Sequence, residues 1–423
     1  MADNVFSVLH ERGFIYQVTD EEKLQHILGS EKLTCYIGFD ATAESFHVGT
    51  LVPIFGLMHM QRAGHTPIAL LGGGTTLIGD PSGKTEMRQL LTRERITSFG
   101  EKLRLQLARF LDFNENRALM LNNAEWLVPL NYIEFLRDIG RHFSVNRMLT
   151  AESYKMRLEK GLSFIEFNYQ LLQAYDFYVL ARDRNCILQM GGQDQWGNIV
   201  AGVDLTRRML SKEVYGMTFP LLMNANGQKF GKTHKGAVWL DREKTSPYDF
   251  YQFWRNIDDA DVEKCLGLFT FLPMEEVRRL PKENINRAKE IVAFEVTTLV
   301  HSREDAVASY TAAGSKFGFS DPECTVATTS SISSVAVDTN ASVPTAELLS
   351  SDLENGYWVV KLLVDAGLCG SNGEARRLIK QGGAYLNDSK IESADMEITN
   401  SHVQDGGVVL RAGKKRYKRV VFK

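Results

Sequence analysis

Short apolar runs alternate with amphipathic stretches over the first half of the chain. The runs at 33–39, 67–71 and 186–190 are each followed by glycine and polar residues, and segments of helical periodicity separate them. Buried strands that alternate with helices are typical of a parallel sheet. The pattern therefore predicts an α/β domain built on a parallel sheet.

Each predicted strand ends in a loop that carries polar groups. The three loops are Gly38-Phe39-Asp40-Ala41-Thr42, Gly72-Gly73-Gly74-Thr75-Thr76 and Gly191-Gly192-Gln193-Asp194-Gln195. In an open parallel sheet, ligands bind at the carboxyl ends of the strands, near the point where the strand order reverses. We therefore expect the three loops to share one crevice.

The second half of the chain has a different organisation. From Pro247 to about Gly318 the pattern is helical, and both the acidic cluster at 258–261 and the segment at 281–283 are typical of helix starts. Between Asp321 and Ala346 the composition changes to Ser, Thr, Val and Ala, with three acidic residues and no Lys or Arg. We interpret this last segment as a linker.

The C-terminal segment, 357–423, is basic. It holds twelve Lys and Arg against seven Asp and Glu, although the whole chain has a net charge of −3. Two short helices are predicted, at 357–367 and 372–381, followed by β-like runs. A folded module with a basic face is typical of binding to structured RNA, and a solvated basic tail is the alternative. The candidate RNA-binding residues are Arg376, Arg377, Lys380, Lys414, Lys415 and Arg416.

Composition excludes several other classes of protein. The hydrophobic fraction of 44% and charged fraction of 24% are those of a soluble globular protein. No apolar stretch is long enough to cross a bilayer, and the acidic N-terminus lacks the features of a secretory signal, so we expect a cytoplasmic location. The five cysteines are scattered without a CxxC pair, so neither a zinc site nor a disulfide framework is expected.

A predicted helix at 161–181 carries a polar stripe. Tyr169, Gln173 and Asp176 fall at i, i+4 and i+7 and therefore share one face, while Phe164 is expected to pack elsewhere. The alternative is a stripe that faces solvent. Because the helix is otherwise rich in Phe, Leu and Tyr, we interpret the stripe as the wall of a polar pocket.

Two remote segments are suited to binding phosphates. His47-Val48-Gly49-Thr50 opens the predicted helix 51–62, where backbone N–H groups and the helix dipole favour an anion. Far downstream, Lys229-Phe230-Gly231-Lys232-Thr233 places two lysines in a glycine-containing loop. If the two segments converge, they can bind one polyphosphate. For each alone, a structural histidine or solvated lysines would be the simpler explanation.

A third segment, Gly79 to Thr85, is similar to a phosphate-binding P-loop but has the wrong spacing. Only three residues separate Gly79 from Gly83, whereas the P-loop needs four. A P-loop nucleotidase is therefore rejected. Lys84 and Arg88 are retained as candidate contacts to a polyphosphate, with ordinary solvated charges as the alternative.

Together these segments resemble the class I aminoacyl-tRNA synthetases, and among them the bacterial-type tyrosyl-tRNA synthetases. His47-Val48-Gly49-Thr50 corresponds to the HIGH motif and the segment from Lys229 to Thr233 to the KMSKS motif. The segments that carry the closest resemblance are Tyr36-Ile37-Gly38-Phe39-Asp40, Leu77-Ile78-Gly79-Asp80-Pro81-Ser82-Gly83-Lys84, Leu172-Gln173-Ala174-Tyr175-Asp176 and Gly192-Gln193-Asp194-Gln195-Trp196-Gly197-Asn198.

The resemblance covers essentially the whole chain and implies its domains. They are a Rossmann-like catalytic domain (1–222), a connection with the KMSKS-like loop (223–246), an α-helical domain (247–320), a linker (321–346) and an S4-like α+β RNA-binding domain (347–423). It also implies a homodimer that binds L-tyrosine, ATP and tRNA. Activation of tyrosine to tyrosyl-adenylate and its transfer to tRNA is the implied reaction. Mg²⁺ is expected to arrive with ATP, without a metal held by the protein.

The resemblance further assigns roles to individual residues. Expected in catalysis are Thr42, His47, Lys84, Arg88, Lys229 and Lys232. Expected at the amino acid are Tyr36 and Asp176 on the phenol hydroxyl, Asp80, Tyr169 and Gln173 on the ammonium group, and Gln195 on the tyrosyl end of the adenylate. Expected at ATP are Gly38, Asp40, His47, Gly49, Thr50, Gly192, Asp194 and Lys232, with Asp194 on the ribose.

Two departures from the family pattern concern the nucleotide, and two alternatives stay open. Thr50 replaces the second histidine of the HIGH motif, and Ile37 replaces a cysteine that contacts the ribose in some relatives. One alternative is the related tryptophanyl enzyme, although Asp176 opposite Tyr36 favours a phenol over an indole. The other is an RNA-binding scaffold without catalytic activity, against which the retained lysines and carboxylates argue.

Overall fold

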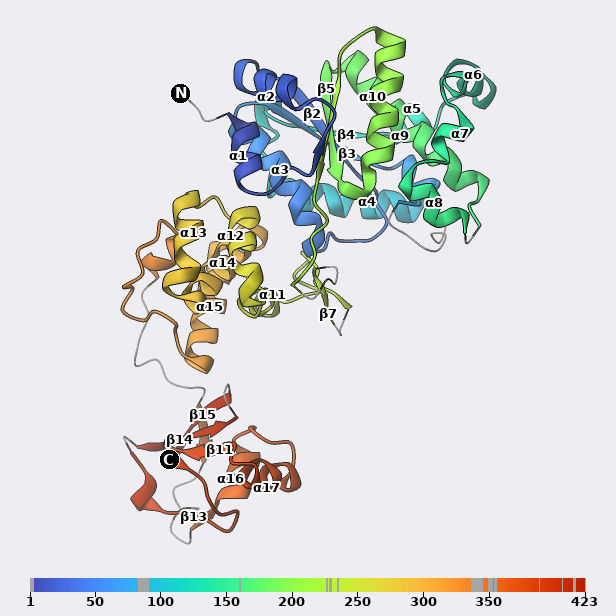
Figure 1. Ribbon diagram of the computed structural model, residues 1–423. Coiled ribbons are helices and arrows are strands. Elements are labelled where there is room, and N and C mark those ends of the chain that lie inside the picture. The colour runs from blue at the N-terminus through green and yellow to red at the C-terminus, as the bar shows by residue number, and fades with distance from the viewer. Residues whose placement is uncertain are drawn as a thin grey trace. The chain divides into compact units, whose positions relative to one another are not determined.

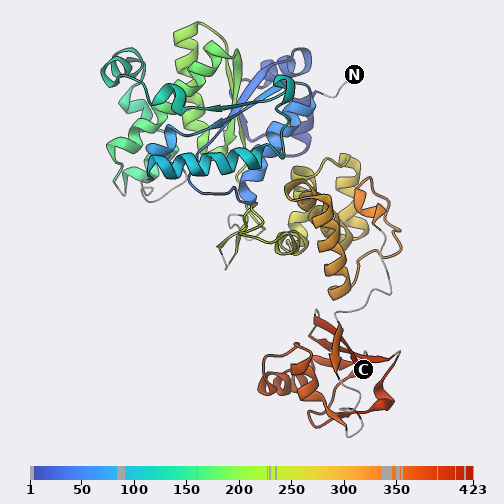
Figure 2. The ribbon, with the colours of Figure 1, turned by 180° about the vertical axis from the view of Figure 1, so that it is seen from behind.

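The structure, a computed structural model, forms two compact units, Met1–Arg303 and Glu304–Lys423. Figures 1 and 2 show these units from opposite sides. The residues that the structure describes are 4–82, 91–159, 161–225, 227, 230–233, 236–335, 345–348, 353, 356–387, 389–404, 406–413 and 416–422.

A six-stranded sheet forms the centre of the first unit (Figure 1). Its strands, in spatial order, are β1 (Gln17–Val18), β6 (Tyr215–Phe219), β5 (Cys186–Gly192), β2 (Thr34–Phe39), β3 (Thr66–Leu71) and β4 (Leu119–Asn122). Neighbouring strands are parallel except for β1, which is antiparallel to β6. The predicted parallel α/β sheet is therefore confirmed, and the strand order reverses between β2 and β5.

Helices of the first unit pack against this sheet. Those of the sheet region are α1 (Val5–Glu11), α2 (Glu21–Ser30), α3 (Leu51–Arg62), α4 (Arg93–Leu107), α5 (Ala124–Leu127), α6 (Tyr132–Asp138), α7 (Val145–Met148), α8 (Glu152–Leu158), α9 (Phe164–Asp183) and α10 (Trp196–Leu210). Among them, α3, α9 and α10 contact the central strands β2 and β5 or their neighbours. One buried cluster joins Tyr36 of β2, Phe177 of α9 and Val203 of α10.

The start of α9 is fixed by local contacts. Ser163 caps the helix, and its side chain and that of Glu166 form a reciprocal capping box. Glu166 also accepts two hydrogen bonds from the buried guanidinium of Arg157, at 3.1 and 3.0 Å. Because this pair is nearly inaccessible to solvent, removing either partner would leave a buried charge uncompensated. The cap and the pair together set where the polar stripe of α9 begins.

A group of helices follows the sheet within the first unit. They are α11 (Pro247–Arg255), α12 (Val262–Phe269), α13 (Met274–Glu283) and α14 (Ile285–Val300). Arg12 of α1 donates hydrogen bonds to the carbonyls of Gly267, Thr270 and Leu272, at 3.0, 2.8 and 2.5 Å. This side chain satisfies carbonyl groups at the end of α12 and ties the helical group to the sheet region.

One expectation about these helices is wrong. Pro281 does not begin a helix but lies in the last turn of α13, and α14 begins after the N-cap Asn284. A proline is tolerated near the end of α13 because the helix terminates two residues later. The acidic cluster does mark a helix start, since Asp258 caps the short turn that leads into α12.

The second unit contains α15 (Arg303–Phe317) and, further on, an α+β fold. The sheet order is β12 (Ser389–Lys390), β11 (Ala384–Leu386), β14 (Gly407–Ala412), β15 (Arg416–Phe422) and β9 (Thr345–Leu348). The strands β10 (Tyr357–Trp358) and β13 (Glu397–Ile398) form a separate antiparallel pair. In the chain, β10 comes before the helices α16 (Val359–Asp365) and α17 (Asn372–Lys380), and β13 comes after them. The two predicted helices are present, although the first begins two residues later than expected.

Part of the segment that was expected to be a linker is packed. Asp321 is buried and accepts hydrogen bonds from the backbone N–H groups of Thr325 and Val326, at 2.8 and 3.0 Å. Ile332 is fully buried within a short helical turn, Ser331–Ser334. Residues 336–344 lie outside the described part of the chain. The predicted domain boundaries remain a prediction.

Candidate active site

A cavity of about 510 Å³ opens where the strand order reverses, at the carboxyl ends of β2 and β5. All three predicted loops contribute to its wall, as expected for an open parallel sheet. The predicted site residues that line it are Tyr36, Gly38, Asp40, Thr42, His47, Gly49, Thr50, Asp80, Tyr169, Gln173, Asp176, Gly192, Asp194 and Gln195. The polar stripe of α9 is therefore a pocket wall, as its sequence pattern indicates.

Asp176 lies at one end of the cavity, fully buried from solvent. Its two carboxylate oxygens accept hydrogen bonds from Asn123 Nδ2 at 2.9 Å and Trp126 Nε1 at 2.8 Å. Burial raises the pKa of Asp176 to about 7, and the two donors oppose this rise because they favour the ionised form. Near neutral pH this group is therefore poised to accept a proton from a ligand or to bind a ligand hydroxyl.

Tyr36 is the second polar group at this end. Its ring is 1% exposed, and within the described residues its buried hydroxyl has no hydrogen-bond partner. Burial, and then the nearby Asp176, raise the pKa of Tyr36 well above its usual value, so the hydroxyl stays protonated. A buried hydroxyl of this kind gains free energy when a polar ligand group reaches it.

Tyr169 joins this end of the cavity to the loop after β2. Its hydroxyl donates to Asp40 at 3.0 Å, and Asp40 also accepts from Thr75 Oγ1 at 2.7 Å. The pKa of Tyr169 is raised well above its usual value by burial first, and then by Asp40, Asp80 and Asp176. Three carboxylates therefore lie near one phenol, and their charges favour a cation in this part of the cavity.

The glycine loop after β3 allows this arrangement. A Cβ atom on Gly72 would lie 2.1 Å from Asp40 Oδ1 and 2.6 Å from Thr75 Oγ1. Any side chain at this position would therefore displace the hydrogen bond between those two residues. The absence of space for a side chain explains why Gly72 directly follows β3.

His47 also lines the cavity. Its Nδ1 accepts a hydrogen bond from the backbone N–H of Gly49 at 3.0 Å. In the neutral imidazole, the proton must then be on Nε2, which becomes a hydrogen-bond donor. His47 precedes the short turn Val48–Thr50 and α3, so the donor stands beside a helix N-terminus that favours anions.

The segments of the two phosphate-binding motifs are joined by backbone hydrogen bonds. We call this junction the clasp: Val48 N–H donates to the Val238 carbonyl at 3.0 Å, and Leu240 N–H donates to the Phe46 carbonyl at 2.9 Å. Between these bonds, the ring of Trp239 meets that of His47 edge-on, with centroids 6.3 Å apart. The clasp places residues 238–240, which follow the second motif in the chain, against the first motif.

Gly231, within the second motif, completes the clasp. Its carbonyl accepts from Val238 N–H at 3.0 Å, and its φ of +83° is a conformation that favours glycine. A Cβ atom here would also lie 3.2 Å from the Cβ of Val48. The adjacent Phe230 is buried against Phe253 and Trp254 of α11, with ring centroids 5.3 and 5.6 Å away.

Some predicted residues are not placed by the structure. Lys84, Arg88, Lys229, Lys414 and Lys415 lie outside the described residues. For Lys232 and Arg416 the structure describes the backbone, in β7 (Lys232–Thr233) and β15. The strand β7 pairs with β8 (Gly236–Ala237) directly before the clasp. Lys232 therefore belongs to a hairpin attached to the cavity wall.

Sequence reasoning missed three residues of the cavity and its surroundings, Asn123, Trp126 and Trp239, and it gave no role to Asn198, which it noted only as part of a segment that carries the family resemblance. Asn123 and Trp126 hold Asp176, and Trp239 packs on His47. Their positions show no periodicity that relates them to the sheet, so only the tertiary contacts reveal them. The clustering of Asn and Trp directly after strand β4 is a local signal for the first two.

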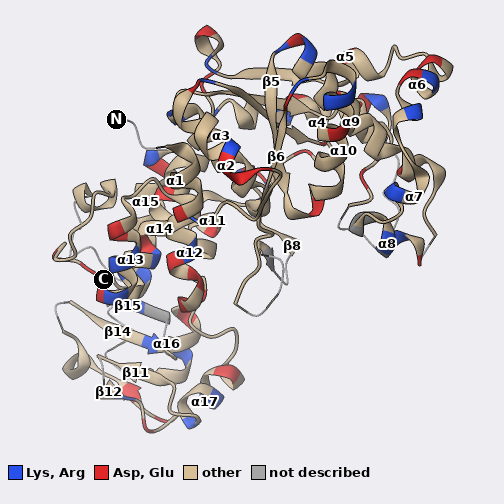
Figure 3. Cartoon of the chain, turned by 45° about the horizontal axis from the view of Figure 1, so that its top comes forward, with Lys and Arg blue, Asp and Glu red and all other residues tan. Residues whose placement is uncertain are grey.

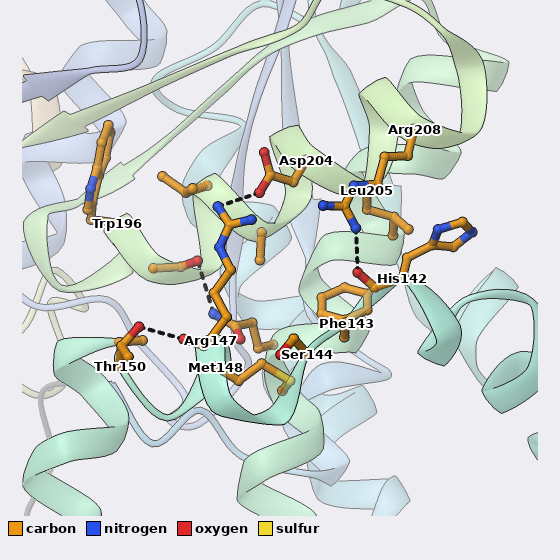
Figure 4. A pocket seen from close by; sticks show the side chains of 15 residues that line it. His142, Phe143, Ser144, Arg147, Met148, Thr150, Trp196, Asp204, Leu205 and Arg208 are labelled. Atoms are coloured by element: carbon orange, nitrogen blue, oxygen red, sulfur yellow. Dashed lines mark hydrogen bonds and ion pairs between the residues drawn. The ribbon is translucent and has the colours of Figure 1, made fainter.

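A second, smaller cavity of about 180 Å³ lies between α7 and α10 (Figure 4). The ion pair between Arg147 and Asp204, at 2.6 Å, and the bond from Arg208 to the His142 carbonyl, at 2.8 Å, cross it. On its inner side Gln170 Nε2 donates to the Gly197 carbonyl at 3.0 Å. These contacts hold α10 against α7 and α9, next to the main cavity.

Among the described residues, no helix is both long and apolar enough to span a membrane. Within the same residues, no group of three or more His, Cys, Asp or Glu side chains is arranged to hold a metal ion.

The chain matches two family models. Residues 29–317 match the model of class I tRNA synthetases (W and Y), and residues 337–420 match that of the tyrosine–tRNA ligase SYY-like C-terminal domain. The first match contains the sheet, the cavity and the following helices. The second contains the α+β fold of the second unit.

Similar proteins cover the chain almost completely. A tyrosine–tRNA ligase from Desulfosudis oleivorans is 54% identical, over 99% of this chain and 99% of its own length. One from Desulfatibacillum aliphaticivorans is 55% identical, over 100% and 99%. A solved structure of a C-terminally truncated mitochondrial tyrosyl-tRNA synthetase from Aspergillus nidulans has a TM-score of 0.66 and 30% identity, over 73% of this chain and 92% of that one.

The structure predicts how the pKa of Asp176 depends on its neighbours. Asn123→Ala is expected to raise this pKa above about 7, because the substitution removes one donor to the ionised carboxylate. Carbon-13 NMR titration of the carboxyl group measures the change, with the exposed Asn256→Ala as a control of the same type. An unchanged pKa in Asn123→Ala would contradict the described geometry.

Proposed function

The chain belongs to the tyrosine–tRNA ligases, within the class I tRNA synthetase family, and we propose that its main cavity binds L-tyrosine and ATP at opposite ends. The enzyme activates L-tyrosine with ATP and transfers the tyrosyl group to tRNA. The observation that carries the proposed arrangement is the pair of Tyr36 and Asp176, buried together at one end of the cavity.

In this proposal, the pair recognises the phenol hydroxyl of tyrosine. Asp176 accepts the substrate O–H, while the protonated Tyr36 hydroxyl donates to the substrate oxygen. Phenylalanine brings no polar group to this point and would leave both buried side chains unpaired, a discrimination for which tyrosyl-tRNA synthetases are a standard example. An indole N–H offers a donor to Asp176 but no oxygen to Tyr36, so the pair also favours tyrosine over tryptophan.

The cation site beside the pair is suited to the ammonium group of the amino acid. Asp80 accepts hydrogen bonds from Ser82 N–H at 2.9 Å and Gln195 Nε2 at 2.7 Å, and it faces the cavity. Tyr169 donates its proton to Asp40, so its oxygen lone pairs remain for an N–H donor. We assign Asp80, Tyr169 and Gln173 to the ammonium group on this ground.

The carboxylate of the bound tyrosine then faces the nucleotide end. One of its oxygens attacks the α-phosphorus of ATP and forms a new P–O bond. The bond from that phosphorus to the bridging oxygen breaks, and pyrophosphate leaves with the electron pair. Nε2–H of His47 and the α3 N-terminus stabilise charge that develops on the phosphates, and Thr42 lies on the same wall.

The remaining nucleotide contacts come from the loops after β2 and β5. Gly38, Gly49 and Gly192 allow the nucleotide to approach the backbone, and Asp194 is assigned to the ribose. Asp40 and Thr50 complete this wall. Mg²⁺ enters as the complex with ATP, because phosphate oxygens supply most of the ligands that this ion prefers.

The two lysines of the second motif are assigned to the transition state of tyrosine activation. Lys229→Ala and Lys232→Ala are each expected to slow tyrosine-dependent ATP–pyrophosphate exchange by roughly 10²- to 10³-fold, because each removes a charge that stabilises the leaving pyrophosphate. Tyrosine affinity, measured by equilibrium binding, is expected to change less than about twofold.

The exposed Lys102→Ala is the control for this experiment, since its side chain pairs with Glu44 outside the cavity. If the Lys229 and Lys232 variants lost tyrosine affinity as much as they lost exchange rate, a structural role would replace the proposed one.

We further propose that the enzyme is a homodimer, because one region of the first unit exposes many apolar side chains. This region, which we call the apolar edge, comprises Val128, Tyr132, Ile133, Leu136, Val145, Leu158 and Phe164. Ile133 is 69% exposed and Phe164 is 70% exposed, so the expected packing of Phe164 within the chain is wrong. Helices α6, α7 and α8 lie together at this side of the unit (Figure 1).

An exposed apolar surface of this extent is typical of an interface between proteins. The elements beneath it are well packed, since Phe135, Met148, Tyr154 and Leu171 form one buried cluster that joins α6, α7, α8 and α9. The exposed residues are therefore not the product of a loosely folded segment. A second copy of the chain is the partner that this surface implies.

The apolar edge predicts the effect of charged substitutions. Ile133→Asp combined with Phe164→Asp is expected to convert a dimer into a monomer of 47.7 kDa, because the two charges would be desolvated in the interface. Sedimentation velocity measures the mass. Leu105→Asp, at an apolar residue on α4 that is 55% exposed, is the matched control and should stay dimeric. A wild-type monomer, or a dimeric double variant, would contradict the proposal.

The second unit is proposed to bind tRNA through α17. Arg376, Arg377 and Lys380 are exposed, while Ala375 and Ile379 on the opposite face of the helix are buried. In Figure 3, positions of Lys and Arg on α16 and α17 are coloured blue. The guanidinium of Arg376 lies 5.1 Å from the ring of Trp358, which restricts its side chain and prepares it to meet a phosphate.

This proposal predicts that RNA binding and amino-acid activation separate. Replacing Arg376, Arg377 and Lys380 by Ala is expected to lower kcat/KM for tRNA at least about tenfold and to reduce its salt dependence, because up to three phosphate contacts are lost. ATP–pyrophosphate exchange by the same variant should be unchanged. Equal loss in both assays would place the three residues outside RNA recognition.

The domain boundaries and the cellular location are also proposals. The division at 222, 246, 320 and 346 follows the sequence pattern, and the clasp gives the connection at 223–246 a defined role at the nucleotide end. A cytoplasmic location fits an enzyme that must meet tRNA and ATP.

A further inference from the structure

A buried asparagine lies behind the amino-acid end of the cavity. Asn198, the third residue of α10, is 2% exposed. Its Nδ2 lies 2.9 Å from Gln173 Oε1, 3.1 Å from Gln195 Oε1 and 3.4 Å from Ser82 Oγ. An amide nitrogen has two hydrogens, so the two short contacts to the glutamines use both of them. Asn198 is therefore bonded to two proposed substrate-binding residues at once.

Asp80 determines which atom donates and which accepts in each of these hydrogen bonds. A carboxylate only accepts, so Gln195 must turn its Nε2 toward Asp80, which it contacts at 2.7 Å. Its Oε1 then points to Asn198, which must present a donor. That donor in turn requires the oxygen of Gln173, not its amino group. A single chain of hydrogen bonds thus sets the orientation of three amides that would otherwise be free to flip.

We propose that Asn198 is a positioning residue for tyrosine. As part of the hydrogen-bond chain that starts at Asp80, it fixes the orientations of the Gln195 and Gln173 side-chain amides. This inference rests on the proposed function of the cavity. With its oxygen held by Asn198, Gln173 keeps a second lone pair of Oε1 for the substrate ammonium. Without Asn198, Gln173 gains the freedom to turn its amino group toward the cation and repel it, whereas Asp80 still orients Gln195.

The position of Asn198 is itself well held. The preceding residue, Gly197, accepts a hydrogen bond from Gln170 Nε2 at 3.0 Å, and a Cβ atom on Gly197 would lie 3.2 Å from the Cβ of Ala151. Further along α10, the Arg147–Asp204 pair holds the helix against α7 (Figure 4). The first turn of α10 is therefore fixed independently of the substrate, as a positioning role requires.

Two substitutions test the proposal by opposite means. Asn198→Ala removes the donor and is expected to raise KM for tyrosine about tenfold, the loss of roughly one hydrogen bond, with kcat and KM for ATP within about threefold. Asn198→Asp puts an acceptor where the chain needs a donor and is expected to raise KM for tyrosine about 100-fold at pH 8, since it also opposes both glutamine oxygens.

The pH dependence of Asn198→Asp separates positioning from packing. As the pH falls, the new carboxyl group takes up a proton and can donate one of the two hydrogen bonds, so KM for tyrosine, divided by the wild-type value at the same pH, should fall from its value at pH 8. The Asn198→Ala ratio should not depend on pH. Tyrosine-dependent ATP–pyrophosphate exchange gives both constants, and the exposed Asn256→Ala serves as the control. Circular dichroism establishes that each variant is folded.

The possible outcomes separate a failure of the proposed function from a failure of the positioning role of Asn198. If the wild-type enzyme lacks tyrosine-dependent exchange, the proposed function fails. If the wild-type enzyme is active and the Asn198→Ala variant keeps its KM for tyrosine, or loses kcat and both KM values together, only the positioning role is overturned. A pH-independent ratio for a folded Asn198→Asp variant would overturn it as well. If that variant does not fold, Asn198→Ala alone decides.

Discussion

The active site depends on the clasp, the pair of backbone hydrogen bonds that joins residues 46–48 to residues 238–240. Nearly 200 residues separate its two sides, and the sheet strands β3 to β6 lie between them in the chain. Each bond contributes about 0.5–1.5 kcal/mol. Their importance is positional, because they attach the segment that follows the hairpin with Lys232 to the segment that contains His47, which the proposed function requires for one nucleotide site.

The other end of the cavity is organised by charge. Asp40, Asp80 and Asp176 all face it, and each is held by donors from the protein. Their mutual repulsion and burial are tolerated because hydrogen bonds compensate them in part, and because an amino acid brings its own cation. Burial first, and then nearby carboxylates, raise the pKa values of Tyr36 and Tyr169 and keep both hydroxyls protonated. In the proposed function, this electrostatic arrangement recognises the amino acid.

Much of this account could be predicted from the sequence. Apolar runs identify strands, and strand order explains why three loops meet, since parallel strands place their carboxyl ends at one edge. The helical spacing of Tyr169, Gln173 and Asp176 was sufficient to predict a pocket wall. Contacts that depend on tertiary packing could not be predicted: Asn198 and Trp239 reach their partners only after α10 and the clasp have formed. Phe164 was misjudged because periodicity alone does not tell whether an apolar side chain packs within the chain or stays exposed on it.

The clasp itself is open to a direct measurement, native-state hydrogen exchange of the backbone amides in the free enzyme. If the two motifs are joined as described, the amides of Val48 and Leu240 should be protected to a similar degree as those of the central strand β2, because they donate to carbonyls across the junction. Exchange of these two amides at the rate of an open loop would contradict the account, since the two motifs would then be free to separate.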